Sequence, residues 1–369
     1  MDIAAVDLFC GAGGLTHGLE RAGIPVVAGV DADPKCEYPY EQNTDAEFVR
    51  ADIRPLAQNP ERIKRRYPWN TDLTVLGACA PCQPYSPLGG SAGSRSDDHE
   101  KWGLLDDVRK IVDYVEPDIV VTENVLQIRH DETYDKFVKT LEANGYDVNS
   151  DENKNVYGPE YGIPQRRKRW VLVASKTSRI ELPDPFYTDE DDYPTAEETI
   201  GHLPPIGAGE AHSDYELHRA RSLSETNLER IRHMEPGGDW RLWEEDGLEH
   251  LLADCHKRDS GRSYKAPYSR MVPDEPAPTI TTQFYNYGSG RFGHYDTDQD
   301  RALSILEGAL LQTFPEDYDF YDEWEDVGVK NMGRLIGNAV PPRLAEVVGN
   351  TILEETDVTA STATAIADD

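Results

Sequence analysis

A chain of 369 residues is longer than one typical domain, which predicts one large domain and a smaller one. Its 69 acidic and 37 basic residues give a net charge of −32. This charge opposes binding to nucleic acid unless local basic clusters exist. The acidic residues are spread along the whole chain, which also suits a protein of a salt-rich cytoplasm. No segment approaches the roughly 20 apolar residues of a membrane span and the N-terminus lacks the features of a signal peptide, so the sequence predicts a cytoplasmic protein that contacts no membrane.

The first half of the chain alternates short apolar segments with helical patterns. Strands are expected at residues 3–9, 25–30, 73–76, 118–122 and 169–174, and helices at residues 15–22 and 104–115. Strands separated by helices are typical of a parallel, doubly wound sheet, so the expected fold class is α/β and Rossmann-like.

The composition changes after about residue 182. Residues 184–198 are rich in acids, and residues 200–290 carry many Gly, Pro, Tyr and Arg residues without a clear period. Helical patterns return at 302–312 and 343–353. The expected organisation is a first domain at 1–183, a linker and second domain at 184–324, a segment at 325–353 that completes the first domain, and a disordered tail at 354–369.

Glycine and polar residues follow the expected strands, where ligands bind in a doubly wound sheet. A glycine loop at residues 10–14 follows the first strand, and Asp31 stands about 20 residues later, where a carboxylate can hold ribose hydroxyls. Thr16 replaces the third glycine of the nicotinamide fingerprint, so the loop favours an adenosine-bearing cofactor that need not be a dinucleotide. A tight turn without a ligand and a plain surface acid remain the alternatives.

Cys82 follows the third expected strand and is the candidate nucleophile. The prolines of residues 81–84 fix the backbone around it, whereas a lone buried cysteine is usually inert packing. Cys82 also forms a C-x-x-C pair with Cys79, but no second ligand pair stands at zinc spacing, so we predict no metal site. Glu123 follows the apolar residues 119–121, and partial desolvation there suits it to donating a proton or a hydrogen bond. The alternative is a solvated acid paired with a neighbouring arginine.

Five segments resemble, in order and spacing, the motifs of the DNA (cytosine-5)-methyltransferases over residues 3 to about 350. They are Asp7-Leu8-Phe9-Cys10-Gly11-Ala12-Gly13-Gly14, Pro81-Cys82-Gln83, Glu123-Asn124-Val125, Gln165-Arg166-Arg167-Lys168-Arg169 and Gly337-Asn338-Ala339-Val340-Pro341-Pro342. The resemblance implies a Rossmann-like methyltransferase sheet with a smaller inserted target-recognition domain, S-adenosyl-L-methionine as cofactor and double-stranded DNA as substrate.

The resemblance also implies a role for each residue at a motif position. Cys82 would attack C6 of a cytosine flipped out of the duplex, and Glu123 would contact N3 of the ring. Arg167 would touch the O2 atom of the base, and Arg169 is the next arginine of that motif. The residues implied to bind the cofactor are Phe9, Gly11, Gly13, Gly14, Leu15, Asp31, Asp52, Ile53, Pro81, Leu104, Asn338 and Ala339.

Target recognition is expected between Arg169 and residues 277–281, which resemble the family's motif before its final helices. Within this span, residues 256–270 are strongly basic for so acidic a chain, with Tyr264 and Tyr268 interleaved. The residues expected to bind DNA are Lys257, Arg258, Arg262 and Arg270, together with Gln83 and Ser86 near the phosphates beside the flipped nucleotide. A solvated surface loop is the alternative for the basic segment. It is also the alternative for residues 89–103, whose composition fits a mobile lid over the base.

Ala32 departs from the family, in which an aromatic residue often follows the ribose-holding acid and stacks on adenine, so some adenine contact is expected to be lost. Three other functions stay open: a related transferase acting on tRNA cytosine, a nicotinamide-dependent oxidoreductase and a silent DNA-binding paralogue. The sizeable recognition domain argues against the tRNA transferase, and the missing third glycine argues against the oxidoreductase. The presence of both Cys82 and Glu123 argues against the silent paralogue. A restriction endonuclease that shares the DNA target and a monomeric state are further expectations.

Overall fold

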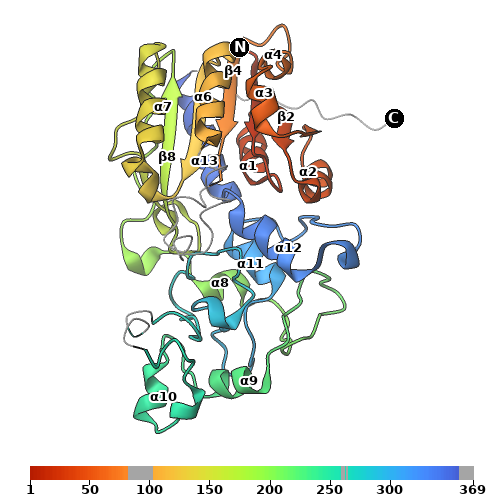
Figure 1. The fold of residues 1–369 in the computed structure, drawn as a ribbon, viewed down its shortest axis with the longest axis vertical. Coiled ribbons are helices and arrows are strands. Elements are labelled where there is room, and N and C mark those ends of the chain that lie inside the picture. The colour runs from red at the N-terminus through yellow and green to blue at the C-terminus, as the bar shows by residue number, and fades with distance from the viewer. Residues whose placement is uncertain (82–102, 259–261, 263–264, 357–369) are drawn as a thin grey trace.

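The computed structural model describes residues 1–81, 103–258, 262 and 265–356. Figure 1 shows two parts, one above the other: a sheet covered by helices, and a smaller part that is rich in loops. Within these described residues the sheet contains eight strands. They are β1 (Ile3–Leu8), β2 (Val26–Asp31), β3 (Glu47–Arg50), β4 (Leu73–Ala78), β5 (Ile119–Asn124), β6 (Asp147–Val148), β7 (Asn155–Tyr157) and β8 (Lys168–Ser175).

The strand order of the sheet is β3-β2-β1-β4-β5-β8-β6, with β7 also paired to β8. The strands β1 to β5 are mutually parallel, and the order reverses direction between β1 and β4. This reversal is the topological switch point at which doubly wound sheets bind their ligands. The α/β, doubly wound fold class is thereby confirmed.

One strand corrects the expectation of a wholly parallel sheet. β8 runs antiparallel to β5, β6 and β7, so the sheet is mixed. Six consecutive residues of β8, from Trp170 to Ser175, are buried. A strand that is covered on both faces reads as a continuous apolar run in either direction, and its sequence therefore did not reveal its orientation.

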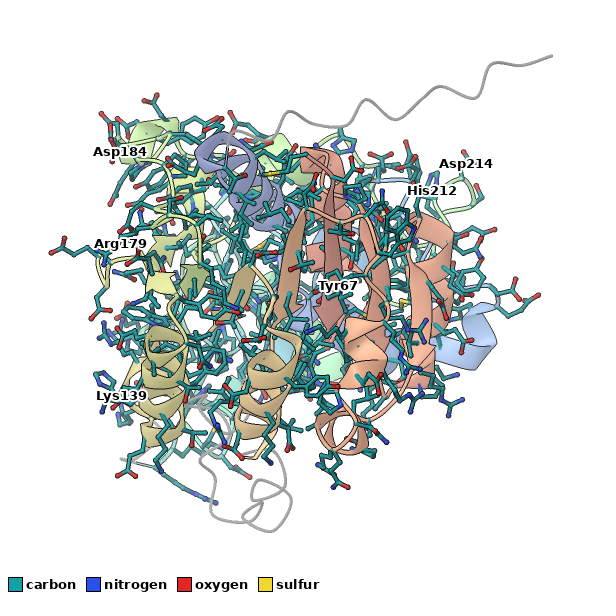
Figure 2. All side chains as sticks on the ribbon, turned by 90° about the horizontal axis from the view of Figure 1, so that it is seen from above. Tyr67, Lys139, Arg179, Asp184, His212 and Asp214 are labelled. Atoms are coloured by element: carbon teal, nitrogen blue, oxygen red, sulfur yellow. The ribbon has the colours of Figure 1, made fainter. Side chains whose placement is uncertain are left out.

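Helices cover both faces of the sheet (Figure 2). One layer contains α3 (Ile53–Ala57), α4 (Glu61–Lys64), α6 (Leu104–Val115) and α7 (Glu132–Ala143), and α2 (Glu37–Asn43) packs beside β3. The other layer contains α1 (Gly14–Ala22) from the N-terminal region and α13 (Pro342–Glu355) from the C-terminal region. α6 has the bounds expected from the sequence, whereas α13 extends past the expected residues 343–353.

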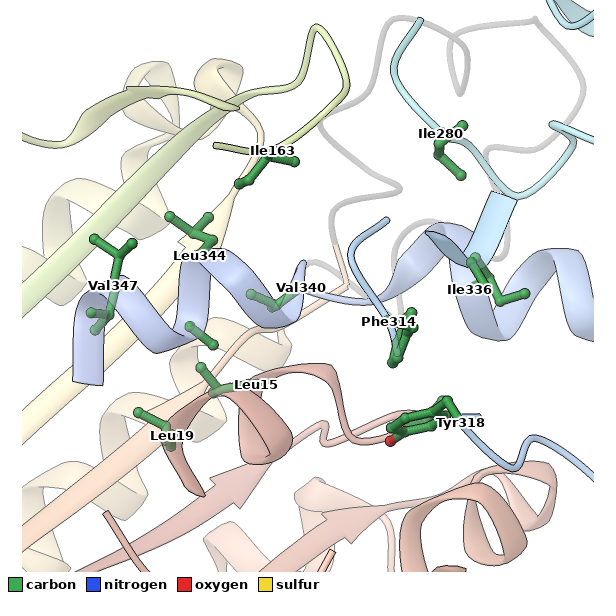
Figure 3. Close-up of a cluster of buried hydrophobic side chains, with 14 of the residues drawn as sticks. Leu15, Leu19, Ile163, Ile280, Phe314, Tyr318, Ile336, Val340, Leu344 and Val347 are labelled. Carbon is green, nitrogen blue, oxygen red and sulfur yellow. The ribbon is translucent and has the colours of Figure 1, made fainter. Parts of the chain in front are cut away.

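The contact between α1 and α13 depends on glycine. A Cβ atom at Gly18 would lie 2.3 Å from the carbonyl oxygen of Pro342, and one at Gly14 would lie 2.2 Å from that of Val340. Both distances are shorter than a real Cβ contact allows, so the two helices come this close only because these side chains are absent. Figure 3 shows the apolar side chains around this contact, with Leu15 of α1 beside Val340 and Leu344 from the C-terminal segment.

The smaller part contains α8 (Ala196–Ile200), α9 (Glu225–Arg232), α10 (Arg241–Glu245), α11 (Ile305–Leu311) and α12 (Trp324–Asn338). The acid-rich residues 184–198 are attached to the smaller part by a hydrogen bond. The backbone N–H of Ala196 donates to the carbonyl of Glu275 at 2.9 Å. A separate apolar cluster around Trp240 and Trp243 forms the core of the far end. α12 packs on α11 and α13 packs on α1, so the C-terminal segment spans both parts.

Two further expectations concern the ends and surface of the chain. α13 continues to Glu355, past residue 354 where the tail was expected to begin, and residues 357–369 lie outside the described residues. Within the described residues, no helix is both long enough and apolar enough to cross a membrane.

Candidate functional site

The carboxyl ends of the parallel strands open onto a cavity of about 470 Å³. Such a volume is typical of sites that hold a cofactor or another small molecule. The walls come from the loops that follow β1, β2, β3 and β4, from Glu123 of β5, and from the end of α12. Sheet and C-terminal segment therefore build the cavity together.

Most of the residues expected to bind the cofactor meet at this cavity. Phe9, Gly11, Leu15, Asp31, Asp52, Ile53, Pro81, Leu104, Asn338 and Ala339 line it. Gly13 and Gly14 do not belong to its lining. Gly13 adopts φ +92°, which favours glycine, and precedes the first residue of α1, while Gly14 gives α1 its close approach to Val340. Both glycines therefore determine the path of the loop without lining the cavity.

Two acids in the cavity are held by backbone N–H groups. Asp31 accepts hydrogen bonds from the N–H of Gly11 at 3.1 Å and from the N–H of Asp33 at 2.9 Å. Burial raises the pKa of Asp31, and these backbone hydrogen bonds oppose that rise. Asp52 accepts from the N–H of Arg54 at 2.9 Å and thereby caps α3. Each carboxylate keeps capacity for a ligand hydroxyl or amine.

Asp7 also lines the cavity, and no role was expected for it from the sequence, although it begins the first of the five motifs. It is 1% exposed, and one carboxyl oxygen accepts from the hydroxyl of Thr16 at 2.8 Å. Among the described residues the other oxygen, Oδ1, has no hydrogen-bond partner. Burial is the main cause that raises the pKa of Asp7 to about 7, with the nearby charge of Asp31 adding to it.

Glu123 forms an ion pair inside the cavity. Its Oε1 lies 2.6 Å from Nε of Arg169 and 3.9 Å from Nε of Arg167, and all three side chains are nearly buried. The guanidinium of Arg167 also donates to the carbonyls of Ile280 and Ala339, both at 3.2 Å. Arg167 thus connects three segments of the chain, whereas Arg169 is the arginine next to the carboxylate.

The candidate nucleophile, Cys82, lies outside the described residues, as do Gln83, Ser86 and all of the expected lid except Gly103. The chain is described up to Pro81, which lines the cavity together with Ala80 and Cys79. Burial raises the pKa of the Cys79 thiol well above its ordinary value, and the nearby Glu123 carboxylate raises it further. A thiol held in its protonated form is a poor nucleophile.

Gln165, which opens the fourth motif, joins the two parts of the molecule. Its side chain is buried, donates to the carbonyl of Leu311 at 2.9 Å and accepts from the N–H of Ile280 at 2.9 Å. No separate role was expected for Gln165 from the sequence, and its position in a motif was the only signal.

The basic segment at residues 256–270 separates into exposed and buried residues. Lys257 and Arg258 are exposed, and Arg262 is exposed while paired with Glu244 at 2.9 Å. Tyr264 lies outside the described residues, and Tyr268 packs edge-on against Tyr287.

Arg270 corrects the expectation of a DNA contact. It is 1% exposed and donates to the carbonyls of Ile231, His294, Asp296 and Gln299 and to the carboxylate of Asp300. A guanidinium that is buried and bonded on every side cannot reach a DNA groove, so Arg270 is a structural residue. The count of basic residues in the sequence could not distinguish this burial from exposure.

Comparison with known proteins gives one consistent family. The family model described as C-5 cytosine-specific DNA methylase matches residues 3–354. The Type II methylase M.HgiDII of Herpetosiphon aurantiacus is 42% identical over 352 residues, which cover 95% of this chain and 94% of that protein. The Type II methyltransferase M1.HphI of Haemophilus parahaemolyticus is 29% identical, with 96% of this chain and 87% of that protein covered.

Solved structures show the same fold at low sequence identity. The Entamoeba histolytica methyltransferase EhMeth has a TM-score of 0.63 at 14% identity and covers 96% of this chain and 99% of its own. A putative DNA modification methyltransferase from an E. coli prophage has a TM-score of 0.60 at 20% identity, with 96% and 100% covered. Together with the sequence matches, the cavity at the switch point leads to one conclusion: the chain belongs to the C-5 cytosine-specific DNA methylases and is an enzyme that methylates C5 of cytosine in DNA with S-adenosyl-L-methionine as the methyl donor.

Proposed function

We propose that this enzyme acts through a covalent bond between the Cys82 sulfur and C6 of a cytosine flipped out of a specific DNA sequence. The observation that carries the proposal is the Glu123–Arg169 ion pair in the cavity that Pro81 also lines, because Cys82 is the next residue after Pro81. A carboxyl group near the end of β5 and a thiol that follows the neighbouring strand β4 can act on the same small ring. Cys79 is half-buried and burial raises the pKa of its thiol well above the ordinary value, so it is a much weaker candidate.

In the proposed reaction the Cys82 thiolate forms a bond to C6, and the electron pair of the C5–C6 double bond becomes available at C5. Glu123 contacts N3 and stabilises the charge that develops on the ring. S-adenosyl-L-methionine supplies an electrophilic methyl group, which C5 accepts. Water then accepts the proton from C5, the bonding pair of that proton restores the C5–C6 double bond, and the pair of the sulfur–C6 bond leaves with sulfur, which regenerates the Cys82 thiolate.

The Arg169 guanidinium has two tasks in this proposal. It fixes the orientation of the Glu123 carboxylate at 2.6 Å, and its remaining N–H groups can donate to O2 of the base. The sequence resemblance gave the O2 contact to Arg167. Arg167 donates to two carbonyls and lies 3.9 Å from Glu123, whereas Arg169 donates to one carbonyl, that of Lys168, and lies next to the carboxylate, so the contact fits Arg169 better.

The cavity residues fit the methyl donor. Asp31, held by Gly11 and Asp33, would bind the ribose hydroxyls, and Asp52 with Ile53 would hold the adenine. The carboxyl groups that line the cavity suit the positively charged sulfonium and amino groups of the ligand. The cavity volume of about 470 Å³ suits the size of the ligand.

DNA recognition is proposed for the loop-rich part at residues 184–324. Its exposed basic residues, Lys257, Arg258 and Arg262, would contact base edges or phosphates, while Gln83 and Ser86 would lie beside the flipped nucleotide. The names of the Type II relatives support a restriction endonuclease that acts on the same site. We further propose that the enzyme works as a monomer.

The nucleophile is tested with DNA that contains 5-fluorocytosine in the methylated sequence. Fluorine cannot leave C5 as a proton does, so the enzyme is expected to remain covalently attached to the DNA when the methyl donor is present. Peptide mapping should place the adduct on Cys82. An adduct on Cys79, or none at all, contradicts the proposed mechanism.

Glu123 is tested by substitution with glutamine, which keeps the shape of the side chain but removes its acid. Turnover is expected to fall by roughly 10²–10⁴, the usual effect of losing a general acid. Binding of S-adenosyl-L-methionine, measured by calorimetry, should persist. An unchanged turnover would mean that the carboxylate serves only to anchor Arg169.

A further inference from the structure

The cavity has an unusual wall next to Asp31. The following residue, Ala32, lines the cavity with nothing larger than a methyl group. The wall at this end also includes Arg334, which comes from α12, far away in the sequence. The planar guanidinium of Arg334 thus lines the same end of the cavity as Ala32, the residue after β2, which carries no ring.

Arg334 is fixed in place by its neighbours. Its Nη1 pairs with the carboxylate of Asp33, whose side chain also accepts from the N–H of Lys35 at 3.0 Å. The N–H of Asp33 donates in turn to Asp31 at 2.9 Å. A continuous series of contacts thus connects the acid that is proposed to hold the ribose with the guanidinium of Arg334. The Arg334 side chain is 35% exposed, so part of it is shielded from water.

A guanidinium in this position can bind a flat ring. Arginine stacks on aromatic faces through both its planarity and its charge, and partial shielding from water strengthens the contact. Arg54 is a second guanidinium in the lining, but it pairs with Asp52, whereas Arg334 pairs with Asp33, the residue next to Ala32. Arg334 is therefore the better placed of the two to cover the ring above Ala32.

We propose that Arg334, oriented by Asp33, covers the adenine ring of bound S-adenosyl-L-methionine and replaces the ring side chain that position 32 lacks. The inference rests on the proposed placement of the adenosine between Asp31 and Asp52. It makes the C-terminal segment a determinant of cofactor affinity and not only a structural support.

The test is the Kd of S-adenosyl-L-methionine, measured by isothermal calorimetry on the full chain. Arg334→Met keeps the length of the side chain but removes its plane and charge, and affinity should fall roughly 2- to 30-fold. Arg334→Lys keeps the charge but not the plane and should lose nearly as much. S-adenosyl-L-homocysteine, which lacks the sulfonium charge, should show the same fold-change, because stacking acts on the ring that both ligands share.

Two further variants make the test specific. Ala32→Trp introduced into the Arg334→Met chain should restore most of the affinity, because it supplies a ring. Arg21→Met is the matched control, since Arg21 also forms a partly exposed ion pair, with Glu346 at 3.5 Å, and does not line the cavity. The thermal midpoint of each variant without ligand separates a loss of binding from a loss of folding.

The outcomes that overturn the inference are distinct. Wild-type affinity in folded Arg334→Met or Arg334→Lys would exclude stacking by Arg334. Loss of affinity in Arg54→Met instead would assign the ring contact to Arg54. If the wild-type protein itself bound neither ligand, the proposed cofactor site would be wrong. An unchanged Kd in the variants would instead contradict only the contact proposed for Arg334.

Discussion

Asp7 shows how much one buried carboxyl group can matter in this cavity. It lies at the end of β1 under the glycine loop, bonded to Thr16, whose hydroxyl also lies 2.9 Å from that of Tyr40. The raised pKa of Asp7, about 7, means that the folded protein retains a proton that the unfolded chain loses near pH 4. Folding therefore takes up a proton between these two values, and this contribution to stability is lost as pH rises toward 7.

Asp7→Asn should remove this pH dependence. From pH 5 to pH 7 the difference between the free energies of unfolding of the variant and the wild type is expected to shift in favour of the variant by about 1.4 kcal/mol per pH unit. The gain should level off above pH 7. Urea unfolding at several pH values measures both proteins. Parallel profiles for the two would mean that Asp7 is ionised in the folded protein over the whole range.

The loop-rich part is organised by short elements and bridging side chains and not by long helices. Backbone bridges join Arg270 to Pro236 and to Gly293, and Gly293 to Ala302. The Arg270 guanidinium binds the carbonyls of the surrounding loops, so several loops depend on one residue. Exposed basic residues of the same segment, such as Arg258, have no such task and are available to a partner.

Two arginines of this segment should therefore respond differently to substitution. Arg270→Met should lower the free energy of unfolding by roughly 3–5 kcal/mol, as when a buried ion pair is broken. Arg258→Ala should leave the thermal midpoint unchanged but weaken DNA binding or relax the methylated sequence, with a loss of about 1–3 kcal/mol if it reads a base. Denaturant unfolding and methylation mapping test the pair. A stable Arg270→Met protein with an altered target would return Arg270 to the DNA interface.

The whole molecule carries a charge of −32 and yet acts on a polyanion. Acidic side chains stand out around its rim, among them Asp184 and Asp214 (Figure 2). At low salt these carboxylates repel each other and DNA, and at molar salt the Debye length falls to about 3 Å and most of this repulsion is screened. Contacts at short range, such as those of a flipped base, persist under those conditions.

Methyl transfer is therefore expected to rise as KCl increases from about 0.1 M into the molar range. The folded state should weaken when salt is removed. Initial rates and thermal midpoints between about 0.1 and about 3 M KCl test both statements. A matched NaCl series separates screening from a specific effect of potassium. A rate that is highest at the lowest salt and falls steadily would show that the acidity is not an adaptation to salt.

The sequence by itself determined the parallel strands β1, β2, β4 and β5, the bounds of α6 and most of the residues that line the proposed cofactor site. Apolar runs of four to six residues separated by amphipathic helices leave few other arrangements. The carboxyl ends of parallel strands then meet at one edge, which is why the loop at Gly11, Asp31 and Glu123 could be placed together. Strands as short as β6 and β7 carry too few residues to show a period and were not expected.

Only the tertiary structure decided the direction of β8, the burial of Arg270 and the position of Arg334 beside Asp33. Orientation and burial depend on neighbours that are distant in the chain, and a charged residue reads the same in sequence whether it faces water or five internal acceptors. Arg334 reaches the cavity because the glycines of α1 admit α13 and thereby bring the preceding α12 to the sheet edge. Packing between the two ends of the chain thus completes the cavity in which we propose that the cofactor binds.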